Sequence, residues 1–328
     1  MVKWTKIERI VEGKPSFRKN QVKNWVFKKL ITSWENASSL PKSLRKELAE
    51  KAPLKIEGKV LKGKKISKAR IKLGNKDMVE TVLMKHGERN TVCVSSQVGC
   101  PVGCTFCLTG KKGFFRNLKW EEIVNQILFF ERSTGITNVV FMGMGEPFLN
   151  YKEVIKAARF INQPDTFNIG ARKISISTIG IPEKIIRFAE ESFQANLAFS
   201  LHAPDNKLRT KLIPINEKYP LEEILKSLKL YLDKTNRKIM IEYVLINGVN
   251  DSRKKALKTA KLLKEYFPLH LFMVNLIIYN PTQDFKPSSI KNIENFKMVL
   301  EQEEIEVTIR EKIGKDVKGA CGQLAANF

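Results

Sequence analysis

Three cysteines lie close together in this sequence, Cys100, Cys104 and Cys107, with the spacing C-x3-C-x2-C. Thiolates are soft ligands, and three of them on one short loop suit either an iron–sulfur cluster or zinc. No further Cys pair or Cys/His pair follows at the distance that closes a tetrahedral zinc site. Three ligands leave one iron of a [4Fe–4S] cube free to bind a small molecule. The spacing therefore predicts an open [4Fe–4S] cluster, with a structural zinc knuckle as the alternative.

Polar residues also follow a series of apolar runs farther along the chain. The segment Phe141–Pro147, FMGMGEP, combines glycines, which let a ligand approach the backbone, with Glu146, whose carboxylate can accept from an ammonium group. The polar residues that end the later runs are Ser177, Ser200, His202 and Asn280. Each of them alone is compatible with ordinary packing. Their regular recurrence after apolar runs makes them candidates for one ligand site.

Two cysteines lie outside the cluster loop. Cys93 falls on an apolar run just before it, and Cys321 lies between small residues near the end of the chain. A thiol on a glycine-flanked segment is mobile and little shielded, which favours reactivity. The alternative is that both are incidental buried cysteines.

Strand and helix patterns alternate after residue 90. The runs expected as strands are Thr91–Ser95, Asn138–Met142, Lys173–Ser177, Asn196–Leu201, Lys238–Leu245, Leu271–Ile278 and Glu306–Ile309. Helices are expected near residues 119–133, 150–162, 182–191, 220–234, 251–266 and 288–303. Six β-α units predict an α/β fold, a parallel sheet curled into a partial (β/α)6 barrel, with an open doubly wound sheet as the alternative. In either architecture ligands bind at the carboxyl ends of the strands, where the polar residues above fall.

The chain before residue 78 has a different pattern. Residues 1–50 predict short amphipathic helices, and residues 54–84 predict a small antiparallel sheet. We therefore expect a basic N-terminal α+β domain over residues 1–77, the barrel over 78–310, and a C-terminal loop with Cys321 over 311–328.

The charge of the chain is strongly positive. Its 58 basic and 34 acidic residues give +24, and residues 1–75 contribute +15 of this, from 21 basic and 6 acidic residues. A strongly positive protein attracts polyanions. The concentration of positive charge in residues 1–75 therefore predicts an RNA- or DNA-docking module there. Five cysteines in 328 residues do not suggest a disulfide scaffold, and no uncharged run is long enough for a membrane span. These features and an oxygen-sensitive cluster favour a cytoplasmic protein without a membrane partner.

Taken together, the motifs resemble those of the RlmN/Cfr family of dual-radical adenine methyltransferases, which are radical S-adenosylmethionine (SAM) enzymes. The resemblance covers about residues 78–328 in order, and residues 1–75 match loosely. The segments that carry it are Val79–Leu83, Cys93–Cys100, Phe141–Asn150, Ser200–Pro204, Leu212–Leu221, Gly248–Asp251 and Ala320–Leu324.

The resemblance implies a covalent relay. One SAM would methylate Cys321, and a second SAM on the cluster held by Cys100, Cys104 and Cys107 would generate the radical that activates this methyl group. Glu80 would remove a proton from the adduct, and Cys93 would release it through a transient disulfide with Cys321. Without the resemblance, Glu80 would be taken as a solvated strand carboxylate.

The resemblance also implies the ligand contacts and the partners. The implied SAM contacts are Gly145, Glu146, Ser177, Ser200, Leu201, His202 and Asn280. The implied substrate is adenine 2503 of 23S ribosomal RNA, with adenine 37 of tRNA as a second one for members that methylate C2. An electron donor such as flavodoxin or ferredoxin is also implied.

The resemblance favours methylation of C2, with C8 as the alternative. Pro147 after Glu146 is the pattern of members that methylate C2, whereas the segment after Ser177 and the tail before Cys321 lean toward the C8-type members linked to antibiotic resistance. Two other interpretations of the function remain. One is a radical SAM enzyme of another reaction, such as an activase or thiomethyltransferase, and the other is a non-catalytic RNA-binding protein with a zinc knuckle.

Overall fold

The computed structural model describes residues 1–74, 77–282, 284–310, 317 and 319–324. A single large sheet forms its centre, with the strand order β1-β2-β3-β4-β7-β8-β9-β10-β11-β12. The strands of this sheet are β1 (Gly58–Lys62), β2 (Ile66–Lys72), β3 (Met78–His86), β4 (Arg89–Cys93), β7 (Asn138–Phe141), β8 (Ile174–Thr178), β9 (Asn196–Ser200), β10 (Ile239–Leu245), β11 (Phe272–Ile278) and β12 (Val307–Arg310).

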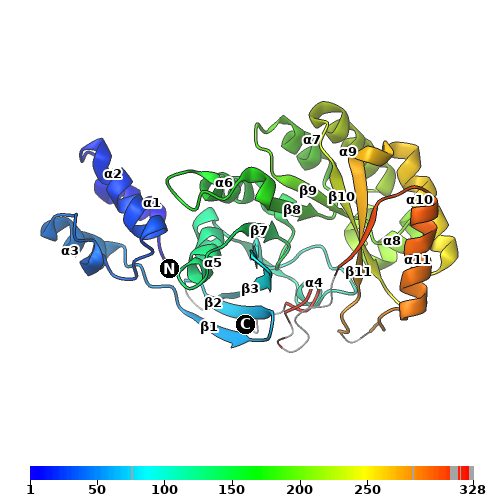
Figure 1. The fold of residues 1–328 in the computed structure, drawn as a ribbon, viewed down its shortest axis with the longest axis horizontal. Coiled ribbons are helices and arrows are strands. Elements are labelled where there is room, and N and C mark those ends of the chain that lie inside the picture. The colour runs from blue at the N-terminus through cyan, green and yellow to red at the C-terminus, as the bar shows by residue number, and fades with distance from the viewer. Residues whose placement is uncertain (75–76, 283, 311–316, 318, 325–328) are drawn as a thin grey trace.

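From β4 onward every strand of this sheet pairs in parallel with the next strand of the sheet along the chain. This consecutive order has no reversal point, so the curled partial barrel is confirmed and the doubly wound alternative is wrong. The helices that connect these strands are α5 (Trp120–Glu131), α6 (Tyr151–Asn162), α7 (Pro182–Glu190), α8 (Asn206–Leu212), α9 (Leu221–Thr235), α10 (Arg253–Tyr266) and α11 (Ile290–Gln302). Figure 1 shows them around the outside of the curved sheet.

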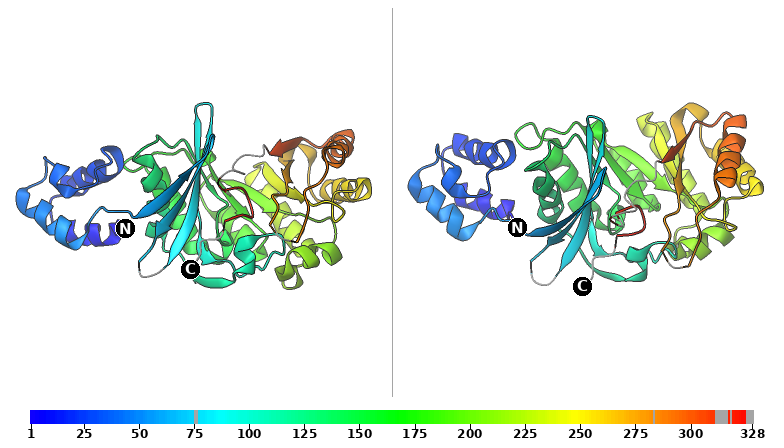
Figure 2. Two further views of the ribbon diagram at one scale, coloured as in Figure 1. Left: turned by 90° about the horizontal axis from the view of Figure 1, so that it is seen from below. Right: turned by 60° about the horizontal axis from the view of Figure 1, so that its bottom comes forward.

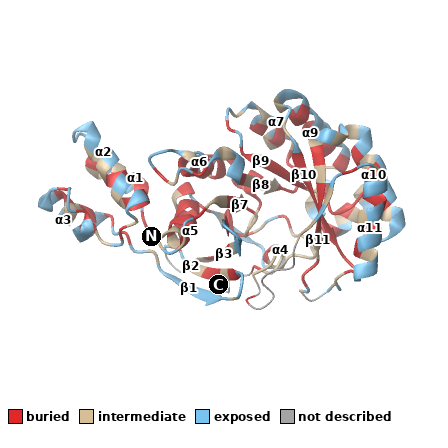
Figure 3. Ribbon diagram, in the orientation of Figure 1, coloured by how far each residue is buried: buried red, intermediate tan, exposed pale blue. Residues whose placement is uncertain are grey.

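The central strands are buried because their sequences are apolar on both faces. β10 (IMIEYVL) and β11 (FMVNLII) have hardly any exposed positions, as a parallel sheet covered by helices on one side and filled on the other requires. Figure 3 shows these strands as buried, whereas the connecting helices expose one face. The expected strand bounds agree with the structure to within about two residues.

Two helices begin slightly later than their apolar pattern suggests. Ser252 and Ser289 lie just before α10 and α11, and each hydroxyl accepts a hydrogen bond from the backbone N–H three residues on. These serines are N-caps with extended backbone, so the helices begin at residues 253 and 290 rather than at 251 and 288. The helix α8 and a two-stranded hairpin of β5 (Gln97–Gly99) and β6 (Phe114–Asn117) were not expected from the sequence.

The small antiparallel sheet is present, and it is continuous with the barrel. β1 pairs with β2, β2 with β3, and β3 with β4, all antiparallel, and β4 then begins the parallel series. Strand pairing therefore runs across residue 77. The division of the chain at residues 77 and 310 stays a prediction, and most of the expected C-terminal loop lies outside the described residues.

The N-terminal helices form a lobe at one end of the molecule (Figure 2). They are α1 (Trp4–Val11), α2 (Ser16–Lys23), which continues into a wider π-type turn at Asn24–Lys28, and α3 (Lys42–Lys51). Phe27 packs edge-on against Phe160 of α6 at 5.2 Å between ring centroids, and Trp4 lies 6.0 Å from the same ring. This aromatic contact joins the lobe to the barrel. None of the helices in the described part of the chain is long and apolar enough to cross a lipid bilayer.

Candidate active site

The cysteine loop is held at its base by the β5–β6 hairpin. Gly99, the last residue of β5, has a φ of +76°, and a Cβ there would lie 2.0 Å from the carbonyl oxygen of Gly113. The next residue, Cys100, donates its backbone N–H to the same carbonyl at 2.8 Å. A glycine is therefore required at position 99, because any side chain would collide with the strand that closes the loop.

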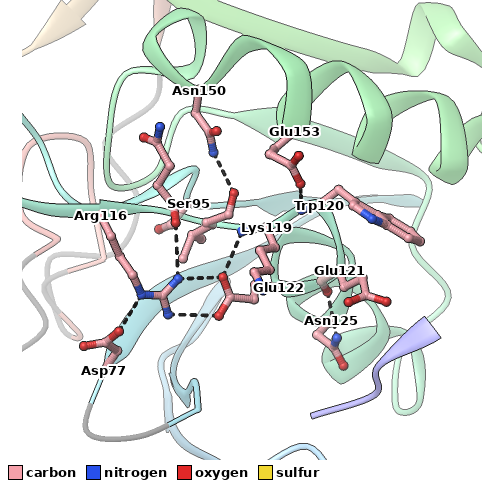
Figure 4. A network of polar contacts seen from close by, with 12 residues as sticks. Asp77, Ser95, Arg116, Lys119, Trp120, Glu121, Glu122, Asn125, Asn150 and Glu153 are labelled. Atoms are coloured by element: carbon pink, nitrogen blue, oxygen red, sulfur yellow. Dashed lines mark hydrogen bonds and ion pairs between the residues drawn. The ribbon is translucent and has the colours of Figure 1, made fainter. Parts of the chain in front are cut away.

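A cluster of charges fixes the hairpin to the start of α5 (Figure 4). Arg116 of β6 donates two parallel hydrogen bonds to the carboxylate of Glu122, at 2.7 and 2.9 Å, and a third to Asp77 at 2.6 Å. Glu122 also accepts from the backbone N–H of Lys119, which caps the helix. Bidentate Arg–carboxylate pairs have a defined geometry, so this contact orients the strand that follows the cysteine loop.

The three loop cysteines face a cavity at the carboxyl ends of the strands. It holds about 1010 Å³ of space, part of which is open to solvent. The sequence-predicted residues that line it are Cys100, Cys104, Cys107, Gly145, Glu146, Ser177, Ser200, His202, Asn280 and Cys321. The structure therefore brings together residues from a span of more than two hundred positions.

Glu146 is buried at the edge of this cavity. One of its oxygens accepts from the N–H of Phe148 at 2.9 Å and the other from the N–H of Ile179 at 3.0 Å. Burial raises the pKa of Glu146 to about 7, against the opposing effect of these hydrogen bonds. Both oxygens already have backbone donors, so the side chain ties the end of β7 to the end of β8. The adjacent Gly145 has a φ of +97° and leaves no room for a Cβ beside Gln97.

His202 lies between the cysteine loop and β10. Its Nδ1 accepts from the N–H of Val244 at 3.0 Å, so the proton of the neutral ring is assigned to Nε2. Burial, and then the positive charge of Arg209, lower the pKa of His202 to about 3. The ring of Phe106 packs edge-on against it at 5.2 Å. His202 is thus a neutral donor that contacts the loop directly.

Ser177 and Ser200 lie on neighbouring strands with their hydroxyl oxygens 3.4 Å apart. Both line the cavity, where they could donate to ligand oxygens. Leu201, by contrast, does not line it: its side chain is fully buried in the core. Its N–H donates to the carbonyl of Glu242 and its carbonyl accepts from Arg209. A contact between Leu201 and SAM stays a prediction.

The C-terminal tail enters the same cavity. Gly322 accepts from the N–H of Leu108 at 2.8 Å, directly after the last cysteine of the loop, and Leu324 accepts from the hydroxyl of Thr109 at 2.6 Å. The side-chain amide of Asn280 donates to the carbonyl of Cys321 at 3.4 Å. These contacts hold the expected reactive cysteine beside the cluster loop.

Cys93 and Cys321 both line an adjoining cavity of about 680 Å³ that also touches Cys107. Burial raises the pKa of the Cys93 thiol to about 12, and the nearby Cys321 adds to this effect. Both cysteines are free thiols, as are the three loop cysteines. The transient disulfide between them stays a prediction.

The loop cysteines fit the donor set that an open cluster requires. All three thiols face the cavity, and burial raises the pKa of Cys100 to about 12 and that of Cys104 well above its ordinary value, so bound iron would be needed to hold them as thiolates. Within the described residues, no three Cys, His, Asp or Glu side chains converge on one metal ion. A cube does not need such convergence, because each of its thiolates binds a different iron.

The comparisons with known proteins agree with this geometry. A model of the radical SAM superfamily matches residues 94–260. A probable dual-specificity RNA methyltransferase RlmN from Dictyoglomus thermophilum is 46% identical over 96% of this chain and 92% of its own length. A protein of the same description from Thermotoga neapolitana is 46% identical over 95% and 92%. A radical SAM methyltransferase from Sphaerobacter thermophilus has a similar crystal structure, with a TM-score of 0.93, 39% identity, and coverage of 98% and 97%.

The chain belongs to the RlmN family of radical SAM RNA methyltransferases. Membership in this family implies a [4Fe–4S] cluster and SAM as cofactors. A likeness to the hydrogenase maturase HydG, with a TM-score of 0.52 at 14% identity, shows the shared fold alone.

The RlmN-family site contains charged residues that the sequence analysis did not single out. Arg310, at the end of β12, lines both cavities and lies 4.0 Å from the buried carboxylate of Glu242. Its pKa is raised, first by the negative charge of Cys321, and then by Glu242 and Cys93, against the effect of burial. Arg310 therefore places a positive charge beside the sulfurs of Cys93 and Cys321. No local motif marks it, because its neighbours in space come from other strands.

Arg209 of α8 is a second such residue. It is fully buried, and it donates to the carbonyl oxygens of Ile179, Ser200 and Leu201 and to the side chain of Asn216. Burial lowers its pKa to about 10. By bonding the ends of β8 and β9 it fixes the backbone that carries the cavity serines and His202. It lies just before Leu212–Leu221, a segment noted in the sequence for its resemblance to the family.

Glu80 is buried on β3, so the interpretation as a solvated carboxylate is wrong. It forms ion pairs with Lys68 at 3.1 Å and Arg70 at 3.0 Å, both on β2. Glu80 does not line either cavity, but strand alternation puts it on the same face as Val82, which lines the cavity shared by Cys93 and Cys321.

Proposed function

We propose that this protein methylates C2 of adenine 2503 in 23S ribosomal RNA, through a methyl group carried on Cys321. The observation that carries the proposal is that Cys321 and Cys93 line one cavity together with Cys107 of the cluster loop. C2 of adenine is an electron-poor carbon, so direct polar transfer from SAM is disfavoured. A relay through a protein sulfur divides this difficult step into feasible ones.

The cluster and SAM, when bound, supply the methyl group and the one-electron chemistry that activates it. Cys100, Cys104 and Cys107 would hold the cluster, and Gly145, Ser177, Ser200, His202 and Asn280 would bind SAM. Glu146 would bind SAM as well: each of its oxygens accepts one backbone N–H, from Phe148 or Ile179, and a carboxylate oxygen can accept a further hydrogen bond.

Cys321, Cys93 and Glu80 would act on the adenine. The sulfur of Cys321 accepts the methyl group. After the one-electron chemistry has removed one hydrogen atom from this group, the remaining methylene carbon would join the sulfur to C2 of the base, and the bound groups would take up the unpaired electron. Glu80 takes the proton from C2. The thiolate of Cys93 then attacks the sulfur of Cys321, so that an S–S bond forms and the bond between this sulfur and the methylene carbon breaks. The carbon keeps the electron pair and takes a proton, which gives the methylated base and a Cys93–Cys321 disulfide for reduction. Arg310 lies beside both sulfurs, and its positive charge opposes the rise that burial causes in the pKa of the Cys93 thiol.

The RNA must present a single unstacked base to the cavity. Turning a base out of folded RNA costs a few kcal/mol, and phosphate contacts with the basic N-terminal region would offset this cost. We propose 23S ribosomal RNA as the main substrate, adenine 37 of tRNA as a further one, and a flavodoxin or ferredoxin as the electron donor. These partners and a reducing environment place the enzyme in the cytoplasm.

The relay is tested by replacing its two cysteines. Cys321→Ala should abolish formation of methyladenosine in an anaerobic assay with SAM and a reductant, because no sulfur remains to carry the methyl group. Cys93→Ala should instead trap a covalent protein–RNA adduct. On a denaturing gel the adduct should appear as a band of higher apparent mass, and RNase treatment should lower that mass. Formation of methyladenosine by Cys321→Ala at the wild-type rate would contradict the proposal. It would favour a radical SAM enzyme of another reaction.

The position of the methyl group is tested separately. Liquid chromatography with synthetic standards, coupled to mass spectrometry, separates 2-methyladenosine from its isomer 8-methyladenosine in a digest of the RNA. Pro147 after Glu146 favours C2, and 8-methyladenosine as the product would establish the C8-type alternative. A colourless protein with bound zinc after anaerobic purification would instead support the RNA-binding zinc-knuckle alternative.

A further inference from the structure

Basic residues form a stripe on the outer face of α6. Lys152, Lys156 and Arg159 are spaced by four and three residues, so they lie on one side of the helix, and all three are exposed. The opposite side of the helix, with Val154, Ala158 and Ile161, is buried against the sheet. Packing therefore does not explain the three cations.

A groove separates this stripe from the N-terminal lobe. It holds about 1050 Å³ of space, part of it open to solvent, between α1 and α2 on one side and α6 and α7 on the other. Figure 1 shows α6 facing these N-terminal helices. The cations that line the groove are Lys19, Lys23, Lys152, Lys156, Arg159 and Arg187.

The groove has an excess of positive charge. Six cations and two carboxylates, Glu8 and Glu191, line it, which leaves a net charge of +4. Lys19, Lys23 and Arg159 form ion pairs with acidic side chains. Among the described residues, Lys152, Lys156 and Arg187 have no carboxylate within ion-pair distance. Like charges gathered in a concave surface repel one another, so an anionic ligand would stabilise this arrangement.

Aromatic rings hold two of these cations in place. The ammonium of Lys156 lies 4.8 Å from the ring centroid of Trp120, and the guanidinium of Arg187 lies 5.0 Å from that of Tyr151. Such contacts restrict the long side chains and reduce the entropy lost when they bind a ligand. The charges are therefore presented to the groove rather than spread through solvent.

A structured RNA fits this groove better than an acidic protein does. The groove shares no lining residue with the cavity at the cysteine loop. An electron donor must approach that loop, whereas a folded RNA is large enough to contact the loop and the groove at once. We propose that this groove binds the phosphodiester backbone of the substrate RNA at a helical segment remote from the target base. This inference rests on the proposed function, because it assumes an RNA substrate.

The test reverses two charges of the stripe. The variant Lys152→Glu/Lys156→Glu is compared with Lys254→Glu/Lys258→Glu, which makes the same change in net charge at exposed positions of α10 with the same spacing. Filter binding measures the affinity of each protein for a transcribed 23S RNA fragment that contains the target hairpin and its flanking helices, over a series of salt concentrations. The milder Lys152→Ala/Lys156→Ala variant and melting curves guard against misfolding.

We expect the groove variant to bind the RNA at least about tenfold more weakly near physiological salt. The slope of log affinity against log salt concentration should be smaller in magnitude by about two. The control variant should lose less than about threefold. Equal losses in both variants, or none in the groove variant, would overturn the inference. The inference would also be overturned if the groove variant bound RNA as the wild type does but was reduced more slowly by flavodoxin and not by dithionite. The occupant of the groove would then be an acidic protein.

The outcome can be separated from that of the proposed function. The groove variant should methylate an isolated short hairpin at the wild-type rate, because this RNA does not reach the groove. If the wild-type protein methylates neither RNA, the proposed function fails. In that case the comparison of binding affinities still shows whether the groove binds RNA.

Discussion

Among the single residues of the site, His202 has the clearest consequence for stability. It is buried between Phe106 and the backbone of β10, and it accepts a hydrogen bond from the N–H of Val244. The protonated ring could not accept this bond, and Arg209 would repel it. The folded protein therefore holds His202 neutral to about pH 3, whereas an unfolded chain protonates it near pH 6.5.

The pH dependence of unfolding should show this difference. Because the unfolded state binds the proton more readily, stability is present above pH 6.5 and is lost as the pH falls toward 3. Between pH 7 and pH 5 the loss due to His202 is about 2 kcal/mol. Denaturant unfolding of wild type and His202→Asn measures it: the variant should lose about 2 kcal/mol less over this interval. Equal losses would show that His202 does not titrate differently in the two states. His86 and His270 contribute equally to both proteins.

At the scale of elements, the β5–β6 hairpin and α5 act as one support for the cysteine loop. Arg116 joins them through Glu122 and Asp77, and Gly99 permits the close approach of the two strands. The tail adds a second support, because Leu108 and Thr109, just after the last cysteine, bond to Gly322 and Leu324. The loop is therefore held at both ends by contacts within the protein itself.

Arg116→Met should loosen this support. About a third of the Arg116 side chain is exposed, so we expect a loss of about 1 kcal/mol and a melting temperature lower by about 2–4 °C. Iron content after reconstitution should fall with it, because the hairpin no longer fixes Cys100. Arg253→Met, at an exposed position of α10, is the control and should change neither quantity. Unchanged iron content in Arg116→Met would show that the cysteine loop does not depend on the contacts of Arg116 with Glu122 and Asp77.

At the scale of the whole molecule, the basic N-terminal lobe is attached to the barrel through aromatic packing. Trp4 and Phe27 both contact Phe160, which is anchored in α6. Trp120 of α5 lies 4.9 Å from the same ring. A single side chain of the barrel thus contacts the lobe and the helix that follows the hairpin, and it sets where the positive charge of the lobe lies relative to the cavity.

Phe160→Ala should uncouple the lobe from the barrel. Truncation of a buried phenylalanine costs about 3–5 kcal/mol, and here the loss falls on the contact between lobe and barrel. We expect trypsin to cleave within residues 1–55 much faster, while the barrel stays resistant. Phe267→Ala, a buried position at the end of α10, is the matched control and should not accelerate cleavage in the lobe. Equal cleavage patterns in both variants would contradict this account of the junction.

Much of the site could be derived from residue order. The spacing of Cys100, Cys104 and Cys107, and the polar residues that end successive strands, predicted one ligand site, because the carboxyl ends of parallel strands meet at one edge. Arg310 could not be found in this way. Its importance comes from its position beside Cys93 and Cys321, which lie about two hundred residues apart in the sequence.

The sequence by itself determined the strands of the barrel, most of its helices and the spacing of the loop cysteines, because these depend on local periodicity and on spacings of a few residues. Only the tertiary structure decided that Glu80 is buried between two cations, that Glu146 accepts from two backbone N–H groups, and that basic side chains of α2, α6 and α7 line one groove. These features depend on which surfaces pack together, and the pairing order of a long sheet, rather than any short motif, sets that packing.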